Sequence, residues 1–129
     1  MIKNLVLIAL TILSCTTKPA QDDADSTKEM AVARRLGLEE FNQLIKDDKV
    51  QLVDVRTPAE YSRGYINGAV NIDFQSADFL TTCSTELDKN KPLAIYCAAG
   101  GRSAKAMKQL KEAGFKKIYE LGVGYNGYK

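Results

Sequence analysis

Histidine is absent from all 129 residues of the chain. Its absence excludes a cysteine–histidine hydrolase and zinc sites built on histidine, because both require an imidazole group. Thiol chemistry survives this absence, since a thiolate that is stabilised by its own loop needs no dedicated base. The chain has three cysteines, and these are the candidate reactive groups.

An excess of charge of either sign is also missing. Lysine and arginine total 18 and aspartate and glutamate total 16, so the formal net charge is +2. The chain shows neither a basic stripe nor an internal repeat. This balance gives no general attraction to nucleic acid, and we expect no nucleic-acid partner.

A long apolar run is missing too. Leu5–Leu13 follows Lys3 and is too short to cross a bilayer as a helix, which is typical of an export signal. The following Ser14-Cys15 resembles the end of the lipobox of bacterial lipoproteins, although Leu13 is bulkier than usual. This resemblance implies cleavage before Cys15, acylation of Cys15 and a domain tethered at the periplasmic face of a bacterial membrane, with the outer membrane compatible. An ordinary secretory signal and a short buried helix are the alternatives.

The chain therefore divides into three parts. Residues 1–14 are the expected lipoprotein signal peptide. Residues 15–35 hold the lipidated cysteine and a polar, flexible tether with clustered acids. Within it, Met30–Leu36 either extends a helix or pairs loosely at the domain edge. Residues 36–129 have the size of one small domain with a single core.

The rest of the chain is arranged around Pro92–Leu110. Here the apolar run Leu93–Tyr96 leads Cys97 into a loop of small residues, Ala98, Ala99, Gly100 and Gly101, and a helical pattern opens at Arg102 and Ser103. Adjacent glycines let the loop turn its N–H groups inward, and the helix N-terminus and an arginine also favour negative charge. Such surroundings lower the pKa of a cysteine, so Cys97 is the candidate nucleophile.

The elements expected from periodicity alternate along the chain. We predict strands at 50–55, 69–72, 93–96 and 117–121, and helices at 38–48, from Thr57 onward, within 74–87, and from Arg102 to Gly114. At the second helix start, Thr57 is the N-cap, Pro58 the first helical residue and Glu60 an early acid. The pattern predicts an α/β domain with a parallel twisted sheet, helices on both faces, and ligands at the carboxyl ends of the strands.

Two motifs resemble the rhodanese-type sulfurtransferase family. CAAGGRS is similar to its active-site loop, and Leu52–Ile72 is similar to its upstream pattern of Asp-x-Arg, Glu-Tyr and Gly-x-Ile-x-Gly-Ala. The resemblance implies a rhodanese-like domain that moves sulfur from a small donor such as thiosulfate to a thiol or cyanide through a Cys97 persulfide. It also implies that Ala98–Ser103 contact the substrate, that Arg56 and Glu60 form a structural ion pair, and that no cofactor or metal is needed.

Several residues have two interpretations. Arg102 either orients an anionic donor or pairs with an acid and braces the loop, and the alanines of the loop leave the donor open. Asp54 ends a strand beside the Cys97 strand and is a possible pocket residue. Cys83 is either an inert buried thiol or a resolving partner for Cys97. The closing glycines at 122 and 124 are expected to pack beside the active loop.

Three other functions compete with sulfur transfer. A phosphatase or arsenate reductase also uses a cysteine, a backbone cradle and an arginine, but commonly with one more loop residue. A non-catalytic binding or sulfur-carrier module usually lacks the cysteine that is present here. A thiol-redox role would pair Cys97 with Cys83. The oligomeric state does not follow from the sequence.

Overall fold

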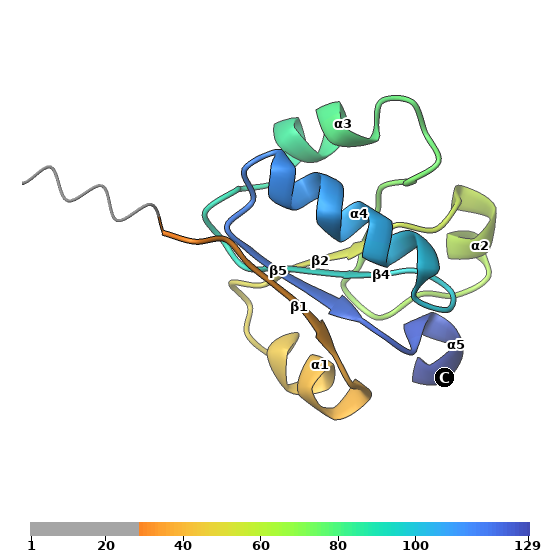
Figure 1. The fold of residues 1–129 in the computed structure, drawn as a ribbon. Coiled ribbons are helices and arrows are strands. Elements are labelled where there is room, and N and C mark those ends of the chain that lie inside the picture. The colour runs from red at the N-terminus through yellow and green to blue at the C-terminus, as the bar shows by residue number, and fades with distance from the viewer. Residues whose placement is uncertain (1–28) are drawn as a thin grey trace, which may run out of the picture.

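The computed structural model describes residues 29–129, so the predicted signal peptide and Cys15 lie outside the described residues. The described chain forms one five-stranded sheet in which every pair of neighbours is parallel, in the order β1-β5-β4-β2-β3 (Figure 1). The strands are β1 (Val32–Leu36), β2 (Gln51–Asp54), β3 (Val70–Asn71), β4 (Leu93–Tyr96) and β5 (Lys117–Leu121). This architecture confirms the predicted α/β class.

Helices cover both faces of the sheet (Figure 1). They are α1 (Leu38–Leu44), α2 (Pro58–Ser62), α3 (Phe79–Glu86), α4 (Gly101–Glu112) and α5 (Gly124–Tyr128). Strand β4 is buried along its whole length, and its side chains alternate between the two faces. Ile95 and Cys97 join the core under α3 and α4, whereas Ala94 and Tyr96 join the core under α1 and α5. The alternation places the Cys97 side chain on the α4 side of the sheet.

Strand β1 corrects the predicted tether boundary. The predicted tether included residues up to 35, but Val32–Leu36 forms the edge strand of the sheet and pairs in parallel with β5, so of the two alternatives for Met30–Leu36 the structure has pairing at the domain edge. Only Leu36 in this strand is fully buried, because an edge strand exposes most of its side chains. Main-chain pairing therefore defines β1, and that pairing leaves little hydrophobic pattern in the sequence.

The other boundaries differ by a few residues from expectation. Helix α1 ends at Leu44 rather than at residue 48, and α3 occupies only the second half of the ambiguous 74–87 segment. Thr57 is the N-cap of α2 and Pro58 its first residue, as predicted. Glu60 completes a capping box: the Glu60 N–H donates to Thr57 Oγ1 at 3.3 Å, and the Thr57 N–H donates to Glu60 Oε2 at 3.0 Å. No helix within residues 29–129 is long and apolar enough to cross a membrane.

Candidate active site

Cys97 lies at the carboxyl end of β4, where the chain turns through Ala98–Gly100 into α4. Gly100 caps the helix with a positive φ of 94°, a conformation that side chains rarely adopt. A Cβ atom there would also lie 2.5 Å from the carbonyl oxygen of Gly122. This conformation directs the Gly100 N–H to the Cys97 Sγ, with a donor–sulfur distance of 3.1 Å. The glycine is thus needed to bring a backbone donor to the sulfur.

The groups around Cys97 act on its pKa in opposite directions. Burial by itself raises the pKa of the thiol, because the interior disfavours a charge. The hydroxyl of Ser103 and the backbone N–H groups of Ser103, Ala99 and Gly100 outweigh burial, so the pKa of Cys97 lies below its ordinary value. The loop thereby stabilises a thiolate without an imidazole.

The sulfur is more enclosed than the sequence led us to expect. Cys97 is only 1% exposed, whereas Ala99 and Gly101 on the same loop are exposed. A donor must therefore reach the sulfur through a small opening or displace the loop. Small donors are favoured over bulky ones by this enclosure.

The end of the chain packs against the loop, as predicted for the closing glycines. The Tyr125 N–H donates to the Cys97 carbonyl at 2.8 Å, and the Asn126 N–H donates to the Ala98 carbonyl at 3.0 Å. Gly124 has a φ of 63°, and a Cβ atom there would meet the Ala98 carbonyl oxygen at 2.3 Å. Only glycine lets α5 approach the loop this closely.

Arg102 braces the loop through an acid on another helix. Its two terminal nitrogens donate to the two carboxylate oxygens of Glu60 at 2.7 and 2.8 Å. The predicted pairing of Arg56 with Glu60 is therefore wrong. The same carboxylate also accepts from the Thr57 N–H at 3.0 Å and from the Thr57 hydroxyl at 2.9 Å. Of the two interpretations of Arg102, the structure has the bracing one.

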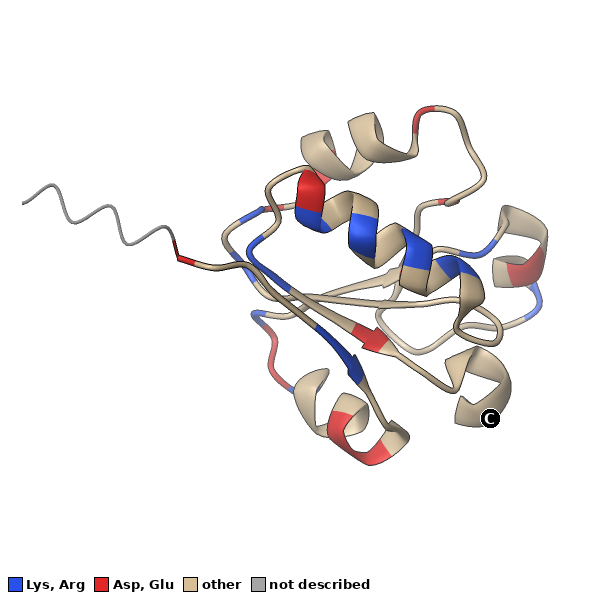
Figure 2. Cartoon of the chain, in the orientation of Figure 1, with Lys and Arg blue, Asp and Glu red and all other residues tan. Residues whose placement is uncertain are grey.

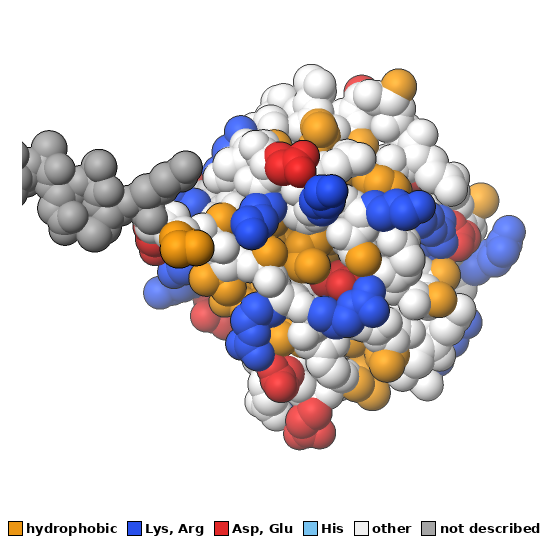
Figure 3. All heavy atoms as spheres, viewed as in Figure 1, with side chains coloured by type: hydrophobic (Ala, Val, Ile, Leu, Met, Phe, Trp, Pro, Cys, Tyr) orange, Lys and Arg blue, Asp and Glu red, His pale blue; other side chains and the backbone are white. Residues whose placement is uncertain are grey.

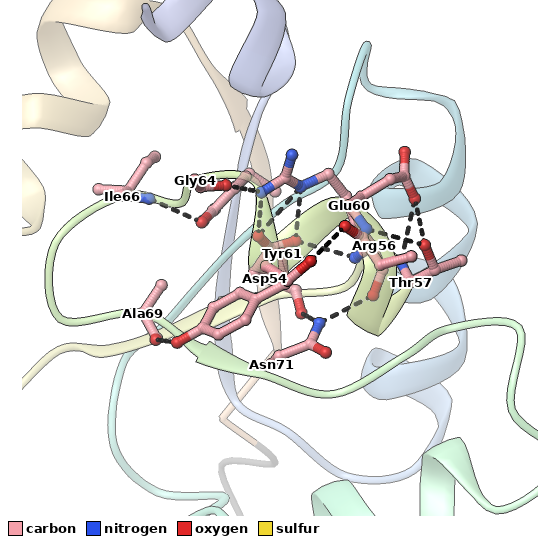
Figure 4. A network of polar contacts seen from close by, with 12 residues as sticks. Asp54, Arg56, Thr57, Glu60, Tyr61, Gly64, Ile66, Ala69 and Asn71 are labelled. Carbon is pink, nitrogen blue, oxygen red and sulfur yellow. Dashed lines mark hydrogen bonds and ion pairs between the residues drawn. The ribbon is translucent and has the colours of Figure 1, made fainter.

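Arg56 pairs instead with Asp54, at the end of β2 (Figure 4). The Arg56 guanidinium donates to both oxygens of Asp54, the shortest contact being 2.6 Å, and the Arg56 backbone N–H donates to the same carboxylate at 2.9 Å. The guanidinium also donates to the Gly64 carbonyl at 2.7 Å and lies 4.2 Å from the centre of the Tyr125 ring. Asp54 is fully buried by these contacts and does not reach the pocket.

A cavity of about 260 Å³ opens beside the loop. Ala98 is the loop residue in its wall, and the remaining wall residues are Arg56, Glu60, Arg63, Tyr125, Asn126 and Lys129. Arg56 is paired with Asp54 and Glu60 with Arg102, so Arg63 and Lys129 are the cations of the wall that lie outside these ion pairs. Basic residues also recur along α4 (Figure 2), and Lys and Arg side chains gather on the face of the molecule that Figure 3 shows. These charges favour an anion in the cavity.

Ser103 was predicted to contact the substrate, but it lies in the interior. Its side chain is fully buried, and its Oγ lies 3.4 Å from the Cys97 Sγ. The same hydroxyl donates to Glu120, which also binds Arg35. Sequence reasoning missed Glu120 and Arg35. The signal was a single acid inside β5, a strand otherwise recognised by its apolar residues.

Cys83 is a buried thiol on α3. It is 1% exposed, and burial raises its pKa to about 12, so it is protonated at neutral pH. Both Cys83 and Cys97 are free in the described chain. These properties favour the inert interpretation of Cys83. Between residues 29 and 129, no group of three or more cysteine or acidic side chains is placed to hold a metal ion.

Replacing Glu60 with glutamine should reduce the acid sensitivity of the fold. The contact with Arg102 lowers the pKa of Glu60 from 4.5 to about 2. Because the folded pKa is the lower one, ionised Glu60 stabilises the protein above about pH 4.5, and this contribution is lost as the pH falls toward 2. Glu60 is partly solvated, so the expected effect is below about 1 kcal/mol.

Urea unfolding of wild type and Glu60→Gln at about pH 6 and about pH 3 measures this difference. The wild type should lose more stability than the variant between the two conditions. The exposed Glu112→Gln is the matched control and should behave as wild type. Equal losses in all three proteins would contradict the assignment.

A parallel α/β sheet whose central strand ends in a loop-stabilised cysteine defines a domain built around a thiolate nucleophile. The family model of the rhodanese-like domain matches residues 37–129, and the chain belongs to this family. A rhodanese-like domain protein from Staphylococcus aureus has the same fold, with a TM-score of 0.64 and 31% identity over 74% of this chain and 91% of that one. A protein from Staphylococcus saprophyticus superposes with a TM-score of 0.63 and 31% identity, covering 74% of this chain and 93% of that one.

Two kinds of sequence relatives carry different names. Thiosulfate sulfurtransferase 16, chloroplastic, of Arabidopsis thaliana is 33% identical over 59% of this chain and 71% of its own length. The tRNA uridine(34) hydroxylase of Pelagibacter ubique is 35% identical over 68% of this chain, but the match spans only 29% of that protein. The likeness to the hydroxylase is therefore confined to one part of a longer chain.

Proposed function

We propose that this protein is a sulfurtransferase that carries a sulfane sulfur as a persulfide on Cys97. In the first step, the Cys97 thiolate attacks the outer sulfur of thiosulfate, the sulfur–sulfur bond of the donor breaks, and sulfite leaves with the electron pair. In the second step, a thiolate or cyanide attacks the outer sulfur of the persulfide. Cys97 is then released as a thiolate, so the cycle consumes no proton or external electron.

The observation that carries this proposal is the Gly100 N–H at 3.1 Å from the Cys97 Sγ. Backbone donors directed at this sulfur stabilise the thiolate before the attack and a negatively charged leaving sulfur after it. The Arg102 guanidinium is bound to Glu60, which supports a bracing role for it rather than a direct contact with the donor. The cations of the neighbouring cavity supply the attraction for an anionic donor such as thiosulfate.

Mass spectrometry of the protein after incubation with thiosulfate tests the proposal. The peptide that contains Cys97 should gain one sulfur atom, and cyanide should remove it. The peptide that contains the buried Cys83 serves as the internal control and should gain none. A Cys97 peptide that stays unmodified at saturating thiosulfate would contradict sulfur transfer from this donor.

The alternative functions make different demands on the same loop. Four residues separate Cys97 from Arg102, and the cradle they form suits one sulfur atom better than a tetrahedral phosphate or arsenate. A generic aryl phosphate should therefore not be hydrolysed. A non-catalytic module has no need of a stabilised thiolate, and a redox pair would need Cys83 to ionise, which its pKa of about 12 opposes.

The relatives support the reaction class at the level of this domain. One of them is named as a thiosulfate sulfurtransferase, and it matches over most of its own length. The hydroxylase shares only the region that includes this domain, so its name supports no statement about hydroxylation by this chain.

We also propose that the domain is held at a bacterial membrane through acylated Cys15. The support is the sequence alone: a charged Lys3, the short apolar segment Leu5–Leu13 and a cysteine directly after Ser14. Replacing Cys15 with alanine should move most of the protein from the membrane fraction to the soluble fraction on cell fractionation, because the acyl chains supply the anchor. The Cys83→Ala variant should stay with the membrane. Full membrane association of Cys15→Ala would refute the lipid anchor.

A further inference from the structure

A buried polar cluster contacts the sulfur of Cys97. The Ser103 Oγ lies 3.4 Å from this sulfur and donates to Glu120 Oε1 at 3.0 Å. Both Ser103 and Glu120 are fully buried. Arg35 donates to both oxygens of Glu120, at 3.0 Å in each case, and to the carbonyl oxygen of Gly100 at 3.0 Å. The cluster thus joins β1, β5 and α4 at the active loop.

The Ser103 hydroxyl has one proton and two neighbours that accept it. An ionised glutamate is only an acceptor, and so is a thiolate. While Cys97 is a thiol, its S–H donates to the Ser103 oxygen, and the Ser103 proton is free to bind Glu120. When Cys97 ionises, the sulfur needs a donor instead, so the Ser103 proton has to turn toward it. The direction of one hydroxyl is therefore linked to the ionisation of Cys97.

Arg35 lowers the free-energy cost of turning the Ser103 hydroxyl away from Glu120. A buried carboxylate without partners is strongly unfavourable, and Glu120 has no exposed surface. When Ser103 turns to the sulfur, Glu120 still keeps two donors from the Arg35 guanidinium. Without Arg35, Glu120 would retain the Ser103 proton because it would be the remaining side-chain donor to this carboxylate in the described structure.

We propose that Glu120, held by Arg35, is a positioning residue that competes with Cys97 for the Ser103 hydroxyl proton and so controls the ionisation of the nucleophile. The inference rests on the proposed function in one respect, that Cys97 is the nucleophile. The competition itself does not depend on the identity of the sulfur donor.

Of the other charged groups named here around Cys97, all but Asp73 are held in ion pairs. Arg102 on α4 is bound to Glu60 of α2, and Asp73 also faces Arg102. On β2, the charge of Asp54 is matched by that of Arg56. The remaining titratable group packed in the same core is the thiol of Cys83 on α3, which is protonated at neutral pH. Ser103 is thus the contact that can change with the charge of Cys97.

The pH profile of Cys97 alkylation tests the competition. Iodoacetamide reacts with the thiolate, and mass spectrometry of the Cys97 peptide reports this residue alone. In Glu120→Gln the competitor loses its charge, so the midpoint of the profile should fall by about 1 pH unit. In Arg35→Gln, Glu120 keeps the hydroxyl proton, so the midpoint should rise. Glu112→Gln makes the same chemical change as Glu120→Gln at an exposed site of α4 and should leave the midpoint unchanged.

A double-mutant cycle separates this route from a plain effect of charge. With Ser103→Ala as the background, Glu120→Gln should shift the midpoint by less than half of its effect with Ser103 present. An equal shift in both backgrounds would show that Glu120 acts only as a charge, and the proposal would be wrong. If Glu120→Gln does not fold, Arg35→Gln decides, because the Arg35 side chain is half-exposed and Glu120 keeps the Ser103 hydroxyl as a donor in this variant. An unchanged midpoint in Arg35→Gln would overturn the proposal.

The alkylation profile is independent of sulfur transfer. The expected midpoints together with no sulfur gain from thiosulfate would refute the proposed transfer and support the positioning role. Sulfur gain on Cys97, together with alkylation midpoints that are unchanged in Glu120→Gln and Arg35→Gln, would support the transfer and refute the positioning role.

Discussion

Replacing Cys97 with serine should reduce sulfur transfer from thiosulfate to cyanide by at least about a thousandfold, because no other described thiol can hold the persulfide. A serine hydroxyl at this position is not ionised at neutral pH and cannot form a persulfide. The fold should be retained, since serine is smaller than cysteine and the Gly100 N–H can donate to its oxygen. Thiocyanate formation measures the transfer, and circular dichroism measures the fold.

Cys83→Ser is the matched control for this prediction. It makes the same atomic change in the same hydrophobic core, but at a thiol that burial keeps protonated. The control should retain transfer even if it loses some stability. Thiocyanate formation by Cys97→Ser near the wild-type rate, or its loss in Cys83→Ser alone, would move the assignment away from Cys97.

The local features of the site could be predicted from the sequence. The residues of β4, the glycines of the loop and the Thr57–Glu60 capping box act over a few positions, and short-range sterics and hydrogen bonding determine them. The enclosure of the sulfur could not be predicted in the same way. It depends on the core under α3 and α4, where residues that are distant in the sequence pack around the Cys97 side chain.

The choice of ionic partners was the least predictable part. Arg102 and Glu60 are separated by 42 positions, and Arg35 and Glu120 by 85. A spacing of four, as between Arg56 and Glu60, invites a local pairing, but the strand end at Asp54 supplies a nearer and more buried partner. The partners in the two long-range pairs depend on how the strands and helices assemble. Short sequence patterns do not predict that assembly.

The two long-range pairs hold the active loop from two sides. Glu60 on α2 holds Arg102 at the start of α4, and Glu120 on β5 shares Arg35 with the carbonyl of Gly100. The backbone donors reach the sulfur only if the loop keeps this shape. The loop has small side chains and little apolar surface of its own, so its geometry depends on these ion pairs and on the hydrogen bonds from α5.

Of the ion pairs near the active loop, Asp54–Arg56 should contribute most to the free energy of unfolding. Replacing Arg56 with methionine should lower the free energy of unfolding by about 3 to 5 kcal/mol, because it leaves the carboxylate of Asp54 buried without its cation. The variant also loses the contacts of the guanidinium with the Gly64 carbonyl and the Tyr125 ring. Urea denaturation followed by circular dichroism gives the change in the free energy of unfolding.

Two further variants show whether the buried charge is the cause. Arg63→Met makes the same replacement at an exposed position and should change the free energy of unfolding by less than about 0.5 kcal/mol. The double variant Asp54→Leu with Arg56→Met removes both charges, so it should be more stable than Arg56→Met alone. If the double variant is instead the less stable of the two, the unpaired charge of Asp54 is not the cause of the loss in Arg56→Met.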